Sequence, residues 1–139
     1  MTHKRNLTLW PFLLVLLIAL FPYGWITRFS IPFQEFMDMI FPNVRAHEIG
    51  HTSMFFLLGS AVLLTFPQLR TRPLLFFELM LLVGIAQEGL QLAYKQRPVV
   101  IDDVRDLIPD MFGATLALGV IQLVSTLRHV KRKDPHPME

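Results

Sequence analysis

The sequence of 139 residues contains no cysteine and little charge. The lack of cysteine excludes disulfide bonds and thiolate chemistry. Asp, Glu, Lys and Arg make up 17% of the chain, and the formal net charge of +2 is too small to indicate a nucleic-acid partner. Hydrophobic residues make up 53% of the chain. The protein is therefore either a hydrophobic soluble domain or an integral membrane protein, and the distribution of charge decides between them.

Charged residues are missing from long stretches of the chain. None occurs in residues 6–27, 52–69 or 111–127, and only Glu78 and Glu88 interrupt residues 73–94. A helix needs about 20 mostly apolar residues to cross about 30 Å of hydrocarbon. We therefore expect four membrane-spanning helices, at about residues 7–28, 44–67, 73–94 and 104–127. The whole chain, residues 1–139, is predicted to be one transmembrane domain.

The first apolar stretch is longer than the core of a cleaved signal peptide, which has roughly 7 to 15 residues. It ends in Tyr23 and Trp25, and such aromatic residues favour a membrane interface. We therefore interpret this stretch as a retained membrane span.

Lys and Arg are more frequent at one end of the predicted helices than at the other. The N-terminus, the second connection and the tail contain eight of them, whereas the first and third connections contain five. Cytoplasmic segments of membrane proteins are enriched in Lys and Arg. Both termini are therefore predicted to be cytoplasmic, and the two longer loops to face outward.

The first outward loop carries apolar residues at helical spacing, at Phe33, Phe36, Met37 and Ile40. This pattern predicts a short helix in the membrane interface. A connecting loop that rests on the other helices is the alternative. The predicted fold is all-α, an integral membrane four-helix bundle with a short interfacial helix in the first outer loop.

Three predicted spans carry an ionisable residue at a similar depth. At about 1.5 Å per residue, His51, Glu88 and Asp110 each lie roughly 10 Å inside the outward end of their span. Neighbouring polar residues at i+3 or i+4 share their helix faces. Because an ionisable group in hydrocarbon costs at least about 2.5 kcal/mol, these faces are predicted to meet in an outward-facing polar pocket. The predicted binding residues are His47, His51, Glu88, Gln91, Arg97, Asp103, Asp106 and Asp110.

Hydrogen bonds that only hold helices together are the alternative role for such polar groups. Glu78 and Gln122 lie at matching depths nearer the other side of the predicted bundle. A hydrogen bond between these two side chains is the simplest expectation for them.

Residues 47–51 read H-E-x-x-H, the pattern in which two His on one helix face bind zinc and the Glu activates water. A zinc hydrolase also needs a third ligand and an open coordination position. Glu88, Asp106 or Asp110 can supply that ligand, but the sequence offers no edge strand to bind a substrate. We therefore expect no metal and no cofactor, and keep a zinc site at His47 and His51 as an alternative.

Three segments follow one another in the chain: HEIGHTSMFFLLG, AQEGLQ and DDVRDLIPDMFGA. In this order they resemble the motifs D-K-x-x-H-F-x-x-Y/F, E-x-x-Q and D-x-x-D-x-x-x-N-x-x-G-A of the VanZ-like family, which is named after a teicoplanin-resistance accessory protein. The resemblance covers about residues 44–120. The matched positions are His51, Glu88, Gln91, Arg97, Asp103, Asp106 and Gly113.

Some positions depart from the family pattern. His47 and Glu48 stand where the family commonly has Asp and Lys, so the H-E-x-x-H match belongs to this sequence rather than to a family metal site. Asp110 stands where the family usually has Asn, which adds an acid to the pocket. The resemblance implies a small multi-pass protein of the bacterial inner membrane, linked in some members to reduced glycopeptide susceptibility. It does not imply a particular reaction.

The expected function is the binding of a cell-envelope component, lipid-linked or glycopeptide-like, in the outward-facing pocket. One alternative is a membrane-embedded hydrolase or transferase that uses the polar residues as general acid and base. Its candidate catalytic residues are His51, Glu88, Asp103 and Asp106. The other alternative is a non-catalytic scaffold subunit. The expected partners are the lipid bilayer and the envelope ligand, and no nucleic acid.

Overall fold

The computed structural model describes residues 3–21, 23–95 and 98–133, and all regular structure within them is helical. The all-α prediction is therefore confirmed. The elements are α1 (His3–Ala19), α2 (Tyr23–Thr27), α3 (Ile31–Ile40), α4 (Val44–Thr65), the 3-10 helix η1 (Pro67–Thr71), α5 (Pro73–Lys95), α6 (Ile101–Arg105) and α7 (Leu107–Lys133).

Three stretches of helix are long and apolar enough to cross a membrane. They are Val44–Thr65, Pro73–Ala93 and Asp103–Arg128, and α1 adds a shorter apolar stretch at Leu9–Ala19. Many large apolar side chains on these helices are exposed, which is the surface expected against lipid rather than water. Examples are Leu57, Leu64, Leu74, Leu82 and Leu123. The structure thus supports a membrane protein.

The first predicted span, 7–28, is wrong as one continuous helix. α1 ends at Ala19, and the short helix α2 begins at Tyr23. Pro22 lies between them in the sequence, and a residue that precedes proline, here Phe21, is disfavoured in a helical conformation. The Tyr23 hydroxyl donates a hydrogen bond to the Ile18 carbonyl (2.9 Å), which holds α2 against the end of α1.

The predicted short helix in the first connection is confirmed as α3. Its N-cap is Ser30, whose hydroxyl accepts a hydrogen bond from the Phe33 N–H (3.4 Å). Pro32 occupies the first turn, where its missing N–H costs no helical hydrogen bond. Asn43 caps α4 in the same way through the Ala46 N–H (3.0 Å).

The last predicted span, 104–127, is interrupted near its start. α6 ends at Arg105, Asp106 forms a turn, and α7 begins at Leu107. Pro109 lies in the first turn of α7 and cannot donate the hydrogen bond that would continue the helix from α6. Asp106 therefore sits at a bend between two helices rather than within one.

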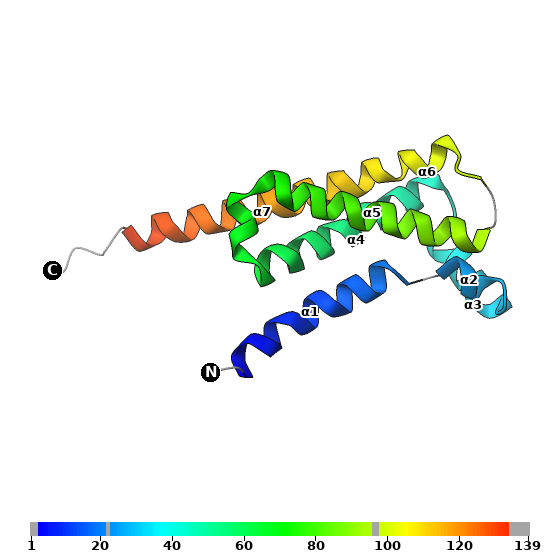
Figure 1. Ribbon diagram of the computed structural model, residues 1–139, viewed down its shortest axis with the longest axis horizontal. Coiled ribbons are helices and arrows are strands. Elements are labelled where there is room, and N and C mark those ends of the chain that lie inside the picture. The colour runs from blue at the N-terminus through cyan, green and yellow to red at the C-terminus, as the bar shows by residue number, and fades with distance from the viewer. Residues whose placement is uncertain (1–2, 22, 96–97, 134–139) are drawn as a thin grey trace.

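The helices α4 and α7 form the centre of the molecule, and α1 contacts α4 while α5 contacts α7 (Figure 1). Small residues line the central contact. A Cβ atom at Gly113 would collide with the Thr52 carbonyl oxygen, and one at Gly59 would lie 3.1 Å from the Ala117 Cβ. Glycine is needed at Gly113 because the two backbones touch there.

Figure 1 shows α2, α3 and α6 at one end of the long helices, with both chain ends directed toward the other. The expected Glu78–Gln122 hydrogen bond is not formed. The Gln122 amide instead donates to the carbonyl of Arg70 in η1 (3.5 Å), and the Glu78 side chain is exposed. The Gln122 amide therefore bonds to a backbone carbonyl of η1 and not to the Glu78 carboxylate.

Candidate functional site

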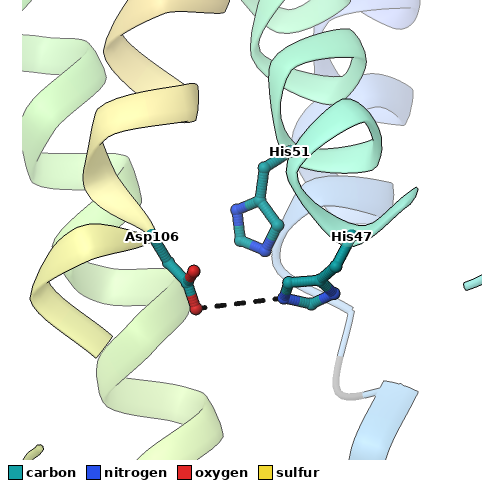
Figure 2. Close-up of side chains that lie close together, drawn as sticks. All are labelled: His47, His51 and Asp106. Carbon is teal, nitrogen blue, oxygen red and sulfur yellow. Dashed lines mark ion pairs between the residues drawn. The ribbon is translucent and has the colours of Figure 1, made fainter. Parts of the chain in front are cut away.

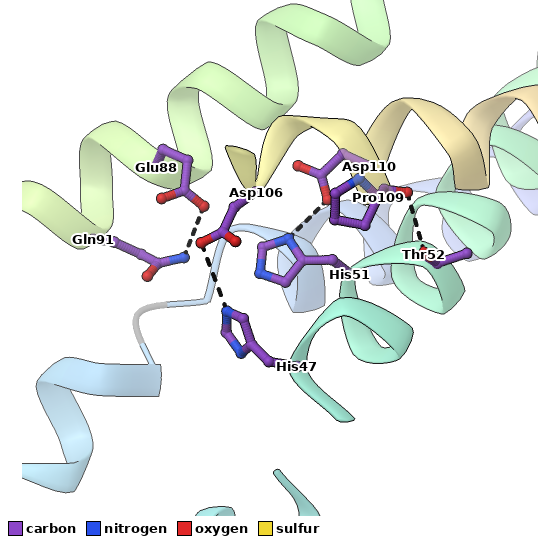
Figure 3. A network of polar contacts seen from close by, with 8 residues as sticks. All are labelled: His47, His51, Thr52, Glu88, Gln91, Asp106, Pro109 and Asp110. Atoms are coloured by element: carbon purple, nitrogen blue, oxygen red, sulfur yellow. Dashed lines mark hydrogen bonds and ion pairs between the residues drawn. The ribbon is translucent and has the colours of Figure 1, made fainter. Parts of the chain in front are cut away.

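A buried histidine–aspartate pair forms the centre of the polar site (Figure 3). His51 of α4 is 6% exposed and Asp110 of α7 is fully buried. The His51 Nδ1 and Asp110 Oδ1 atoms are 2.8 Å apart. The Thr52 hydroxyl donates a second bond between the same helices, to the Pro109 carbonyl (3.3 Å). The structure thus brings together two residues 59 positions apart, on the faces that the sequence predicted to meet.

Helix α5 packs against the Asp110 side chain at Gly84. A Cβ atom at Gly84 would lie 3.2 Å from Asp110 Oδ2 and 3.0 Å from Leu107 Cδ2. Asp110 Oδ2 is buried and has no hydrogen-bond partner in the part of the chain that the structure describes. The carboxylate is therefore fixed on one side by His51 and enclosed by α5 on the other.

His47 and Asp106 extend the site toward the α2–α3 end (Figure 2). The His47 Nε2 and Asp106 Oδ2 atoms are 3.9 Å apart. The His47 and His51 rings lie one helical turn apart, with centroids separated by 4.6 Å, and Phe41 packs its ring edge-on against His47 (6.1 Å between centroids). The bend at Asp106 thus turns a carboxylate toward both histidines.

Glu88 and Gln91 reach from α5 toward the same cluster (Figure 3). The Gln91 amide donates to Glu88 Oε1 (3.2 Å), and the Glu88 side chain is buried. The i+3 spacing therefore produces the shared face that the sequence predicted. Together with α4 and α7, α5 supplies the third wall of the site.

The two remaining predicted site residues are Asp103 and Arg97. Asp103 is buried, and its carboxylate accepts a hydrogen bond from the Val100 N–H (2.9 Å), so that it caps the start of α6. The bend at Asp106 removes Asp103 from the helix that carries Asp110. Arg97 lies outside the described residues.

A cavity of about 470 Å³, here called the α3 cavity, opens beside His51. Most of its lining is apolar, and its polar lining residues are Tyr23, Thr27, Asp38, His47, His51, Gln87 and Gln91. The wall includes Ala19, Phe21, Tyr23, Phe36, Met37, Ile40, Phe41 and Met54. Three residues of the apolar face of α3 line this cavity, and the predicted position of α3 in the membrane interface stays a prediction.

Two other hollows lie near the site. A groove of about 760 Å³ between α4 and α7, here called the α4–α7 groove, is lined by His47, Glu48, Thr52, Arg105, Asp106 and Pro109 together with apolar residues. An apolar fissure of about 400 Å³, here called the α1–α5 fissure, runs between Phe12 and Leu16 of α1, Leu58 and Val62 of α4, and Leu79 and Val83 of α5. His47 borders both the α3 cavity and the groove.

Sequence reasoning missed Gln87 and Met54 as lining residues. Gln87 is partly buried, and its Oε1 atom has no hydrogen-bond partner within the described residues. A polar amide in an apolar helix, next to Glu88, was the available signal for it. Met54 had no such signal, because a methionine in a membrane helix is an ordinary residue.

The assembled groups are suited to proton transfer, to hydrogen bonding with a polar head group and to metal binding. An imidazole whose Nδ1 is held by a carboxylate has its other nitrogen in a defined orientation. Comparisons of this chain with models of protein families, with curated proteins and with solved structures give no match.

Proposed function

We propose that this protein is a multi-pass, VanZ-like protein of the bacterial inner membrane that binds an amphiphilic cell-envelope molecule. One observation carries the proposal: a cavity with several polar lining groups and an apolar fissure follow each other along the same three helices. Leu16, Leu58 and Val83 of the α1–α5 fissure lie one helical turn from Ala19, Met54 and Gln87 of the α3 cavity, respectively. A head group and its hydrocarbon chain can therefore occupy adjoining spaces.

The α3 cavity has the size and lining of a ligand site. Pockets for small molecules commonly measure about 300 to 1,000 Å³ and combine apolar walls with a few polar groups. In the α3 cavity those groups include His51, Gln87 and Gln91, which offer nitrogen and oxygen atoms to a hydroxyl, amide or phosphate. Glu88 and Asp110 orient two of them through the hydrogen bonds to Gln91 and His51.

The proposed orientation places this cavity on the outer side of the membrane. In it, α1 is the fourth membrane helix beside the three long ones, and α3 lies in the outer interface. The excess of Lys and Arg at the N-terminus, in the second connection and in the tail supports cytoplasmic termini. A lipid-linked or glycopeptide-like molecule of the envelope would then reach the site from the outer leaflet.

A second candidate function, acid–base catalysis on such a molecule, is favoured by the His51–Asp110 pair. A base held by a carboxylate is the arrangement that enzymes use to fix the tautomer of a catalytic histidine. Turnover of a lipid-linked substrate that is lost in His51→Gln would support catalysis. Binding without turnover would leave the protein as a receptor.

The binding proposal is tested by filling the α3 cavity. Thr27 lines the cavity, and its hydroxyl bonds only to its own helix, at the Gly24 carbonyl (2.9 Å). We expect Thr27→Phe to weaken binding of teicoplanin and of a polyprenyl-pyrophosphate-linked sugar to the nanodisc-embedded protein by at least about tenfold, or about 1.4 kcal/mol. The measurement is a fluorescence titration of each labelled ligand.

The matched control is Thr126→Phe. Thr126 is exposed on α7 and likewise bonds to its own helix, at the Gln122 carbonyl (3.0 Å), but it lies outside the α3 cavity. The Thr126→Phe variant should bind both ligands with the affinity of the unmodified protein. Unchanged affinity in a folded Thr27→Phe variant would show that the cavity is not the binding site.

A further inference from the structure

We propose that His47, His51 and Asp106 form a binding site for a divalent transition metal of the zinc class. The site goes beyond the proposed amphiphile binding and does not depend on it. Its position is shown in Figure 2, where both histidines of α4 and the carboxylate at the α6–α7 bend face a common space.

The donor atoms are close enough to share one ion. One ligand atom from each of the three residues can be chosen so that all lie within 4.8 Å of one another, and His47 Nε2 and Asp106 Oδ2 are 3.9 Å apart. Ligands at about 2.0 to 2.2 Å from a tetrahedral zinc ion are about 3.3 to 3.6 Å from each other, so the separations here must shorten by about 1 Å at most. Small rotations of the side chains therefore complete the coordination, without a change in the helices.

An independent contact orients one of the ligands. Asp110 Oδ1 lies 2.8 Å from His51 Nδ1, on the opposite edge of the ring from Nε2. Histidines that bind metals commonly donate their second ring N–H to a carboxylate, which fixes the tautomer and raises the basicity of the ligand nitrogen. Asp110 is in turn enclosed by Gly84 of α5. The His51–Asp110 pair is thus the outer shell of the proposed site.

The donor set selects the kind of ion. Two imidazole nitrogens and one carboxylate oxygen suit zinc and related transition metals, whereas calcium and magnesium prefer oxygen ligands alone. Three protein ligands leave at least one coordination position open. His47 borders both the α3 cavity and the α4–α7 groove, so water or an anionic group has access to that position from either side.

The structure also separates this site from the H-E-x-x-H pattern as a whole. Glu48 is exposed and borders the α4–α7 groove, and it does not belong to the group of three ligands. The third ligand is Asp106, one of the three carboxylates that the sequence offered for this role. The proposal therefore takes up the alternative of a zinc site at His47 and His51 in place of our expectation of no metal.

The test measures metal content in tag-free, full-length protein purified in detergent. The protein is treated with a chelator, incubated with Zn²⁺, desalted and analysed by mass spectrometry of the elements. We expect about one zinc ion per chain, and a several-fold lower zinc content after desalting in His47→Ala and in Asp106→Asn, since each removes a ligand. These positions are 45% and 28% exposed at the side chain, so both variants are expected to fold.

Two control variants change related groups that do not belong to the three proposed ligands. Glu48→Gln changes the neighbouring motif residue, and His136→Gln removes a histidine of the tail; both should retain the zinc. Co²⁺ loading gives a second readout, because the visible absorption of the bound ion should change in His47→Ala and persist in Glu48→Gln. Less than about a tenth of an ion per folded chain, or equal zinc in His47→Ala and the unmodified protein, would overturn the proposal.

Discussion

At the scale of single residues, the energetic problem of this protein is the burial of His51 and Asp110. Asp110 is fully buried, and one of its oxygen atoms has no hydrogen-bond partner among the described residues. A buried polar group that loses its partner costs about 1 to 3 kcal/mol. Each member of the pair therefore depends on the other.

A double-mutant cycle measures this dependence. We expect the destabilisation by His51→Leu and that by Asp110→Leu, measured on the metal-free protein, to add up to more than the destabilisation of the double variant. The difference, which is the coupling energy, should be about 1 to 3 kcal/mol. The single variants leave one buried polar group without a partner, whereas the double variant leaves none. The measurement is unfolding in mixed detergent micelles, and strictly additive effects would contradict the expected coupling.

The same scale shows which site residues the sequence could predict. Helical spacing correctly grouped His47 with His51 and Glu88 with Gln91, because each pair lies on an uninterrupted helix. The spacing did not show the bend at Asp106, which places Asp103 in α6, where it caps the helix start, and Asp110 in α7. A bend of this kind depends on one missing hydrogen bond at Pro109, which hydropathy does not record.

At the scale of the helices, the close approach of α4 and α7 positions the site. Gly113 faces the Thr52 carbonyl and the Phe56 N–H, with 3.0 Å between its ideal Cβ position and Phe56 N. Thr52 follows His51 directly, and Gly113 lies three residues after Asp110. The distance between the two helices therefore sets the distance between His51 and Asp110.

Alanine substitutions at two glycines of α7 distinguish the close approach of α4 and α7 from the helix propensity of glycine. We expect Gly113→Ala to lower the free energy of unfolding by about 1 to 3 kcal/mol, because the added methyl group pushes against backbone atoms of α4. Gly119 has no atom within 4 Å of its ideal Cβ position among the described residues, so Gly119→Ala should be neutral or stabilising by up to about 1 kcal/mol.

Thermal unfolding in detergent, followed by circular dichroism, compares the two variants. Equal stability of Gly113→Ala and Gly119→Ala would show that the backbones do not touch at Gly113.

The helices themselves were predicted unequally well. The predicted span at 73–94 agrees with α5, Pro73–Lys95, because its apolar run has turn residues at both ends. The amphipathic spacing in the first connection correctly predicted α3. The break after Ala19 was missed, since apolar residues continue on both sides of Pro22 and only the backbone restriction at Phe21 marks the end of the helix.

At the scale of the whole molecule, the arrangement places the connection that contains α3 and the connection that contains η1 at opposite ends of the long helices (Figure 1). The three long apolar stretches and their exposed apolar side chains are consistent with a bilayer around the middle of the molecule. The two connections should therefore meet different aqueous compartments.

The absence of cysteine makes this prediction simple to check. We expect Glu35→Cys in α3 to react with a membrane-impermeant maleimide on intact spheroplasts, and Thr71→Cys in η1 to react only after permeabilisation. Both positions are exposed, so accessibility of the side chain does not limit labelling. The opposite pattern would reverse the proposed orientation, and labelling of both residues from outside would contradict a membrane-spanning arrangement.

The contact between Gly113 and Thr52 also constrains the order in which the protein can be assembled. It joins α4 to α7, although α5 lies between them in the chain. During synthesis, α4 is complete before α7 exists, and His51 must wait for Asp110 near water or the insertion machinery because hydrocarbon penalises an unpaired polar group. The contact between α4 and α7, and with it the His51–Asp110 pair, can therefore form only after α7 has been made.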